Sequence, residues 1–167
     1  DKIPDNIKDI YIQNIRKIKF NKNIIKICNN FVNRYLGSDA IGLQIRTWID
    51  DPRRKNMFNL KIYKDIIKNI PEHKIIYITT DFPSVIDDLR KSSKNKIITF
   101  SETIKKFTIE KRTVGKYQAD DDFYALIELL ILSNCKIIYG SYISNFPELA
   151  WWLSECKSEV RIVNIPS

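Results

Sequence analysis

The chain has 167 residues, a net charge of +8 and a hydrophobic share of 44%, with 29% charged residues. These proportions fit a single globular domain with enough apolar residues to form a core. The longest apolar stretch, residues 123–132, contains Glu128 and falls short of the run of about 18 residues that a membrane helix requires. The sequence therefore excludes a membrane-spanning helix and predicts no transmembrane segment in this chain.

The positive charge favours anionic partners. The lysines are scattered among Ile and Asn without a compact basic block, so no nucleic acid is expected, and an acidic surface or a phosphorylated ligand remains as the anionic partner. Three cysteines lie far apart and His73 is the only histidine, which predicts free thiols and no zinc site. No secretory leader is visible. Because the chain begins with Asp1 rather than Met, it reads as a piece trimmed from something longer, so the absent leader does not determine the cellular location. With no membrane anchor in this chain, a soluble domain is expected.

The first 37 residues read as a helical lead-in. Apolar residues recur at helical spacing from residue 5 to residue 36, in two sets that predict two helices. Asp5 and Asn21 are the expected N-caps. Gly37 is expected to end the second helix.

Residues 38–167 read as one domain in which short apolar runs alternate with longer amphipathic ones. The short runs predict strands at 40–45, 74–79, 96–100, 136–139 and 160–164. The longer runs predict helices at 57–70, 83–91, 121–133 and 145–154. A polar loop, with room for a short strand, is expected over 101–119. Strands separated by helices need crossover connections, so the pattern predicts an α/β fold with a doubly wound, mostly parallel, five-stranded Rossmann-like sheet.

Ligands of such sheets bind beyond the carboxyl ends of the strands. Gln44 and Arg46 alternate with apolar neighbours at the end of the first strand, so they share one face. An arginine fork there can bind a phosphate, and a glutamine can bind a base or a sugar. The alternative interpretation pairs Arg46 with Asp50 or Asp51.

Two later strand ends carry similar chemistry. Asp81 follows Thr79 and Thr80 after the second strand, where it can contact a nucleotide or cap the next helix, as Ser84 also can; capping is the preferred interpretation. The hydroxyl-rich turn 140–145 precedes a predicted helix whose first backbone N–H groups can bind a phosphate with help from Ser144, or serve only as a cap. Neither GxGxxG nor GxxxxGK[ST] occurs, which disfavours ordinary dinucleotide and P-loop sites.

The triplet Asp120-Asp121-Asp122 has the oxygen ligands that Mg²⁺ or Mn²⁺ prefers. It also lies at the start of a predicted helix, where acidic side chains interact favourably with the helix dipole. The helix-start interpretation is preferred, and no metal site is expected.

Three segments together resemble the donor-binding region of GT-B fucosyltransferases, the superfamily of the α-1,6, plant xyloglucan α-1,2 and protein O-fucosyltransferases. The segment 41–46, IGLQIR, resembles the His-x-Arg motif in its Gln-Ile-Arg form. The segment 76–86 resembles the strand with Thr-Thr-Asp and x-Pro of the α-1,6 group. The segment 125–150 resembles the long helix, strand and Ser-Ser/Thr-Phe motif. The resemblance extends from about residue 40 to residue 153.

The resemblance implies roles for individual residues. Arg46 would bind the donor β-phosphate and assist the departure of GDP. Gln44 stands where the family often has a guanine-contacting histidine, Glu128 aligns with a carboxylate that recognises guanine, and Ser144 aligns with a phosphate-contacting hydroxyl. A carboxylate, Asp81, and an amide, Asn145, would lie beside the nucleotide. The expected donor-binding residues are Gln44, Arg46, Asp81, Glu128, Ser144 and Asn145.

The sequence departs from the family pattern in three places. Thr47 stands where a second arginine is common, the following acid is displaced to Asp50 or Asp51, and Glu replaces Asp at 128. The acid at 50 or 51, or a residue of another lobe, is the candidate general base.

The resemblance also implies a reaction. It implies metal-independent, inverting transfer of a sugar from a nucleotide-sugar donor, GDP-fucose above others, to a hydroxyl of a glycan or protein acceptor, with no further cofactor. A chain of 167 residues barely accommodates an acceptor lobe. The alternatives are a non-catalytic nucleotide- or sugar-binding module, or a fragment without that lobe, and a basic nucleic-acid-binding α/β protein.

Overall fold

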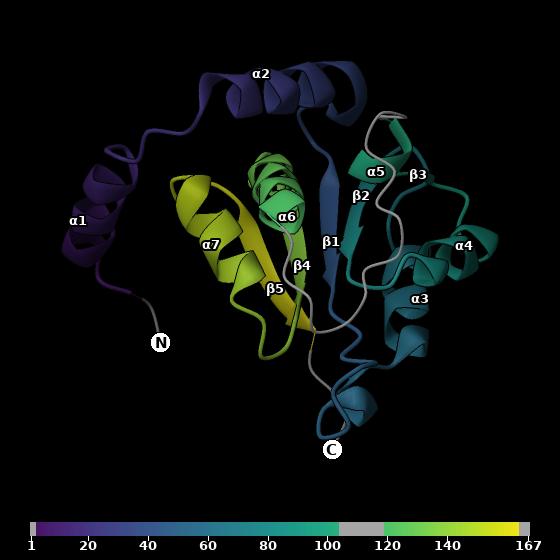
Figure 1. The fold of residues 1–167 in the computed structure, drawn as a ribbon. Coiled ribbons are helices and arrows are strands. Elements are labelled where there is room, and N and C mark those ends of the chain that lie inside the picture. The colour runs from purple at the N-terminus through teal and green to yellow at the C-terminus, as the bar shows by residue number, and fades with distance from the viewer. Residues whose placement is uncertain (1–2, 104–118, 164–167) are drawn as a thin grey trace.

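The computed structural model of the chain describes residues 3–103 and 119–163, which form an α/β fold around one sheet (Figure 1). The sheet has five strands in the order β3-β2-β1-β4-β5, and every pairing is parallel. The strands are β1 Ile41–Ile45, β2 Ile75–Thr80, β3 Lys96–Ile98, β4 Ile137–Ser141 and β5 Glu159–Val163. The predicted Rossmann-like parallel sheet is confirmed.

Helices cover both faces of the sheet (Figure 1). On one face α3 (Leu60–Lys68) and α4 (Ser84–Lys91) pack on the apolar side chains of β1 and β2. On the other face lie α2 (Lys22–Phe31), α6 (Ala119–Leu132) and α7 (Phe146–Leu153). All five residues of β1 are buried, as expected for a central parallel strand covered on both sides.

The strand order reverses between β1 and β4. From β1 the chain proceeds outward to β2 and β3 on one side, and it returns to β4 and β5 on the other. The carboxyl ends of β1 and β4 therefore meet at the position where open α/β sheets form a ligand-binding crevice.

Several boundaries differ from the predictions. Strand β3 ends at Ile98, and α5 (Phe100–Thr103) replaces the rest of the predicted strand. Helix α3 begins only at Leu60, because Asn59 caps it by accepting the Lys61 N–H at 3.0 Å, and a 3₁₀ turn, η2 (Lys55–Met57), precedes it. The loop predicted over 101–119 lies largely outside the described residues.

The caps of the lead-in helices are only partly as predicted. Asn21 caps α2 by accepting the Asn23 N–H at 2.8 Å, which confirms its predicted role. The predicted cap Asp5 is wrong: α1 (Asp5–Ile15) has Pro4 as its N-cap residue, because Asp5 already lies in the helix. A π-helical turn, η1 (Val32–Leu36), extends α2 and ends at Gly37, whose φ of 71° lies in the left-handed region.

The lead-in contacts the sheet domain in two different ways. Helix α2 contributes buried side chains, among them Phe31, to the core beneath α6. Helix α1 has no buried residue and lies against α7, where Tyr11 stacks on Trp152 with ring centroids 4.7 Å apart. Arg16 donates two hydrogen bonds to Glu155, at 2.9 and 2.8 Å.

Within the described part of the chain, none of the helices has the length and apolar character needed to cross a bilayer. The three cysteines are free thiols, as predicted, with Cys28 and Cys135 buried.

Candidate functional site

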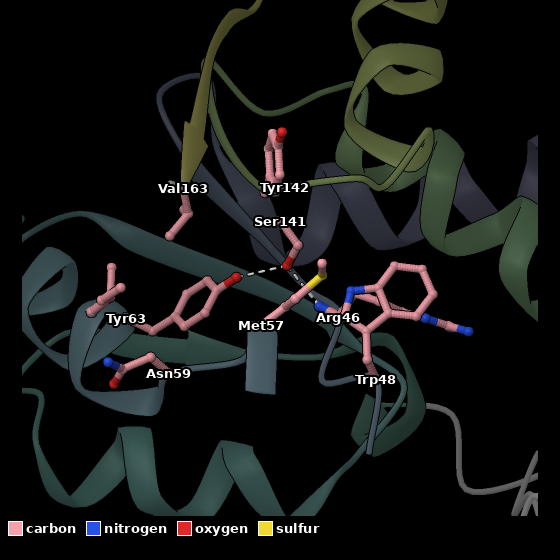
Figure 2. Close-up of a pocket in the computed structure, with 9 residues that line it drawn as sticks. Arg46, Trp48, Met57, Asn59, Tyr63, Ser141, Tyr142 and Val163 are labelled. Carbon is pink, nitrogen blue, oxygen red and sulfur yellow. Dashed lines mark hydrogen bonds between the residues drawn. The ribbon is translucent and has the colours of Figure 1, made fainter. Parts of the chain in front are cut away.

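A small hollow opens at the carboxyl ends of β1 and β4 (Figure 2). It is lined by Arg46, Trp48, Met57, Asn59, Ile62, Tyr63, Ser141, Tyr142 and Val163. Its volume of about 10 Å³ admits roughly one water molecule. The hollow is therefore too small to enclose a nucleotide, and Arg46 and Trp48 meet at its rim.

Ser141 joins the strands beside this hollow. Its Oγ donates to the carbonyl of Gln44 at 3.1 Å and accepts the backbone N–H of Arg46 at 2.7 Å. A serine hydroxyl has one proton, so in the third bond, at 2.6 Å, the Tyr63 hydroxyl is the donor (Figure 2). Burial raises the pKa of Tyr63, which keeps that proton in place.

Ser141 is thus a hydrogen-bonding hub that holds the backbone where Arg46 leaves the sheet. Ser141 lies in the turn that follows the fourth predicted strand, and the sequence pattern indicated no individual role for it. The available signal was a hydroxyl directly at a strand end. Its partner Tyr63, on α3, carried no comparable signal, because one tyrosine on an amphipathic helix is usually a packing residue.

Gln44 is fixed by the same hub. Its side chain is 6% exposed, and its Oε1 accepts the backbone N–H of Ser141 at 3.1 Å. Its Nε2 donates to none of the described residues. The Nε2 amino group of Gln44 is therefore a hydrogen-bond donor that the described residues leave unused.

Arg46 projects from the tip of β1 with its side chain 43% exposed. Its Nε lies 3.3 Å from Oδ2 of Asp81, at the tip of β2, and its guanidinium carbon lies 4.9 Å from the centre of the Trp48 ring (Figure 2). The terminal amino groups of Arg46 donate to no described residue. The second oxygen of Asp81 accepts the backbone N–H and the hydroxyl of Thr47, at 2.8 and 3.1 Å. Asp81 therefore ties the tips of β1 and β2 together.

This arrangement corrects two interpretations. The preferred capping role of Asp81 or Ser84 is wrong, because the N-cap residue of α4 is Pro83 and no side chain caps it. The alternative that paired Arg46 with Asp50 or Asp51 is also wrong, because its acidic partner comes from the neighbouring strand. Local sequence patterns predict pairs between residues that are close along the chain. The sheet instead brings together residues of different strands.

Glu128 lies on α6 beneath the same edge of the sheet. Its Oε2 accepts a hydrogen bond of 2.7 Å from the hydroxyl of Thr79 on β2. Thr79 is the register partner of Gln44, so the two side chains point to the same face. The structure therefore brings Gln44 and Glu128 to one polar group under the sheet edge, and Arg46 and Asp81 to its rim.

Ser144 and Asn145 lie apart from that group, on the turn between β4 and α7. The Oγ of Ser144 accepts the Phe146 N–H at 3.4 Å, and Asn145 is the N-cap residue of α7 without a side-chain bond. Neither residue lines the hollow beside Arg46. The turn reaches the hollow through Tyr142, which is half exposed.

The acidic residues at the start of α6 and Asp51 in the loop after β1 have different surroundings. Asp122 is exposed in the first turn of α6, as the helix-start interpretation expects, while the side chains of Asp120 and Asp121 lie outside the description. Over residues 3–103 and 119–163 no cluster of His, Cys, Asp and Glu is arranged to hold a metal ion. The Arg53 N–H, donated at 2.9 Å, lowers the pKa of Asp51, which makes this carboxylate a weak base.

No protein-family profile matches the sequence, and no curated protein is detectably similar to it. Solved structures do match in fold. POFUT1 in complex with GDP superimposes with a TM-score of 0.61 at 12% identity, over 94% of this chain and 50% of POFUT1. NodZ α-1,6-fucosyltransferase soaked with GDP-fucose gives 0.55 at 16% identity, over 83% of this chain and 44% of NodZ.

A variant of Arabidopsis thaliana FUT1 in complex with GDP gives a TM-score of 0.59 at 18% identity, over 87% of this chain and 33% of FUT1. The matched part of each of these fucosyltransferase structures has the same fold as this chain, which confirms the resemblance at the level of fold. The chain spans half or less of the length of these structures.

Proposed function

We propose that this chain binds a nucleotide-sugar donor, GDP-fucose above others, at the carboxyl edge of β1, as the donor-binding part of a glycosyltransferase. One observation carries the proposal. Arg46 stands where the strand order reverses, its Nε side is held by Asp81, and its terminal amino groups have no acceptor among the described residues. A phosphate is the acceptor that such a fork binds best. The solved structures of the same fold that hold GDP or GDP-fucose support this choice of ligand.

The polar group under the edge provides the base-recognition part of the proposal. Guanine presents an acceptor oxygen, O6, and an exocyclic amino donor. The unused Nε2 donor of Gln44 suits O6, and the carboxylate of Glu128 suits the amino group. The bond from Thr79 fixes the orientation of this carboxylate. Ser144 and Asn145 would contact the phosphates from the β4–α7 turn.

In the proposed reaction an acceptor hydroxyl oxygen forms a bond to the anomeric carbon, opposite the diphosphate. The bond from that carbon to the phosphate oxygen breaks, its electron pair leaves with GDP, and the hydroxyl proton passes to a base. Configuration inverts. Arg46 stabilises the charge that collects on the departing diphosphate, and one such preorganised donor contributes about 2.7–4 kcal/mol in well-studied sites. No metal is required where guanidinium groups provide this charge. Asp50 or a residue outside this chain is the candidate base.

Calorimetric titration with GDP and GDP-fucose tests donor binding. We expect Arg46→Ala to weaken binding at least about tenfold, since a hydrogen bond to a charged group is worth about 1.5–3 kcal/mol. Arg34→Ala is the matched control, because Arg34 also lies over an aromatic ring, at 5.4 Å from Tyr35, but on the helical lead-in. The proposal fails if the wild-type chain binds neither compound, or if Arg46→Ala binds both as the wild type does.

A second candidate function is a non-catalytic nucleotide- or sugar-binding module, since the side-chain contacts proposed above are all with the donor. Such a module would bind GDP or GDP-fucose without transferring the sugar. Transfer of radiolabelled fucose to glycan and protein acceptors, measured beside the titration, separates the two functions.

A further inference from the structure

Trp48, two residues beyond Arg46, has an unusual backbone conformation. Its φ of 54° lies in the left-handed region, which is uncommon for a residue with a large side chain. Residues keep such conformations where the surrounding structure enforces them, and functional sites are enriched in them. At this position the conformation places the indole ring at the rim of the hollow, beside Arg46 (Figure 2).

Two arginines share this ring. The guanidinium carbon of Arg46 lies 4.9 Å from the ring centre, and that of Arg54 lies 4.8 Å from it. The two positive charges are therefore at most about 10 Å apart, which is the distance over which 0.1 M salt screens charges. Arg54 comes from the loop between β1 and α3, so the ring gathers charges from two positions along the chain.

The donors of Arg54 are arranged as those of Arg46 are. Its side chain is 39% exposed, and its Nε lies 3.6 Å from Oδ2 of Asp51. Its terminal amino groups donate to none of the described residues. Stacking uses the face of a guanidinium, whereas its N–H groups point outward along the edge, so contact with the ring leaves them available.

We propose that Arg54 is a second phosphate-binding residue of the donor site, and that Trp48 is the positioning residue that holds both guanidinium groups. The ligand class is the diphosphate of a nucleoside diphosphate or its sugar ester. This inference rests on the proposed function. A diphosphate carries charge on two adjacent phosphates, so it offers acceptor oxygens to two guanidinium groups.

Arg53 provides a matched control beside the site. Its Nε lies 3.5 Å from the same carboxylate, Asp51, and its side chain is 86% exposed. Among the described residues, the cation–π contacts of the Trp48 ring are with Arg46 and Arg54 and do not include Arg53. Replacing Arg53 removes the same charge from the same loop, so it separates binding by Arg54 from a general change in local charge.

The experiment is calorimetric titration of the wild type, Arg54→Ala and Arg53→Ala with GDP and with inorganic pyrophosphate. Thermal melting confirms that each variant is folded. We expect Arg54→Ala to weaken binding of both ligands roughly ten- to a hundredfold, as expected for the loss of charge-assisted hydrogen bonds. Arg53→Ala should remain within about twofold of the wild type, since an exposed pair contributes little. Trp48→Phe, which keeps a ring, should bind more tightly than Trp48→Leu.

The outcomes separate this inference from the proposed function. If the wild type binds GDP and Arg54→Ala binds it equally well, the second phosphate contact is refuted and the proposed function stands. Another outcome is that the wild type binds pyrophosphate but not GDP, and that Arg54→Ala no longer binds pyrophosphate. This result supports the arginine pair as a phosphate site and refutes the assignment of a GDP-sugar donor. Equal losses in Arg53→Ala and Arg54→Ala would refute the specific role of Arg54. Binding of neither ligand by the wild type refutes both.

Discussion

Replacement of Ser141 by alanine tests the hydrogen-bonding hub at the carboxyl edge of the sheet. The side chain is 4% exposed, and its Oγ takes part in three hydrogen bonds, with Gln44, Arg46 and Tyr63. Each bond contributes about 0.5–1.5 kcal/mol net. We expect Ser141→Ala to lower the free energy of unfolding by about 2–4 kcal/mol. Tyr63→Phe removes only one of the bonds, and we expect it to cost about 1 kcal/mol.

The two substitutions are coupled because one bond joins the two hydroxyls. Its loss is included in the cost of each single variant, so the double variant should cost about 1 kcal/mol less than the sum of the singles. Urea unfolding followed by tryptophan fluorescence measures these costs. For a slope of about 1–3 kcal/mol per molar urea, a loss of about 3 kcal/mol shifts the midpoint by roughly 1–3 M.

Ser144→Ala is the control for this cycle. The Ser144 hydroxyl lies on the following turn and takes part in one long bond, from the Phe146 N–H at 3.4 Å. We expect a cost of about 0.5 kcal/mol or less. The reasoning is refuted if Ser141→Ala costs no more than this control, or if the costs of Ser141→Ala and Tyr63→Phe simply add.

Three other perturbations test the packing and the ionisation of the fold. In Gly140→Ala the added Cβ would overlap the rigid ring of Pro147, so we expect a loss of roughly 1–3 kcal/mol in thermal or urea unfolding; an unchanged midpoint would contradict the packing of α7 on β4. Burial raises the pKa of Cys28 to about 11, so in a Cys156→Ser background at pH 8 this thiol should react with a disulfide reagent only after unfolding, and rapid modification of Cys28 in the folded chain would contradict its burial. The hydrogen bond from Arg16 lowers the pKa of Glu155 from 4.5 to about 2, so its contribution is present above pH 4.5 and is lost as the pH falls toward 2. Tryptophan fluorescence should report this loss through Trp152, and a transition that persists in Glu155→Gln would count against the assignment.

The layered fold was predictable because its signal is local. Apolar runs of strand length, separated by amphipathic stretches of helical period, predict parallel strands and crossover helices without long-range information. The short elements were missed for the same reason. The helix α5 has four residues and η2 has three, which is too few to show a period.

Only the part of the site that lies along a single strand could be predicted from the sequence pattern. Alternation along β1 predicted Gln44 and Arg46 at its carboxyl end, and in the structure Gln44 lies in the strand and Arg46 follows its last residue, Ile45. The contacts that hold them come from elsewhere in the chain. The Thr47–Asp81 bond spans 34 residues, and the Arg46–Ser141 bond spans 95. Such contacts depend on strand order and register, which the sequence pattern does not display.

The ion pair between Arg46 and Asp81 is compatible with a phosphate-binding role for that arginine. A pair whose arginine is 43% exposed contributes at most about 1 kcal/mol, so its main effect is to orient the guanidinium. Asp81 is held in place by its two bonds from Thr47. Because the carboxylate takes the Nε side, the two terminal amino groups point along a different edge of the guanidinium plane. A phosphate can bind that edge end-on while the carboxylate keeps its place, and the charge-assisted bonds it forms there are the stronger ones.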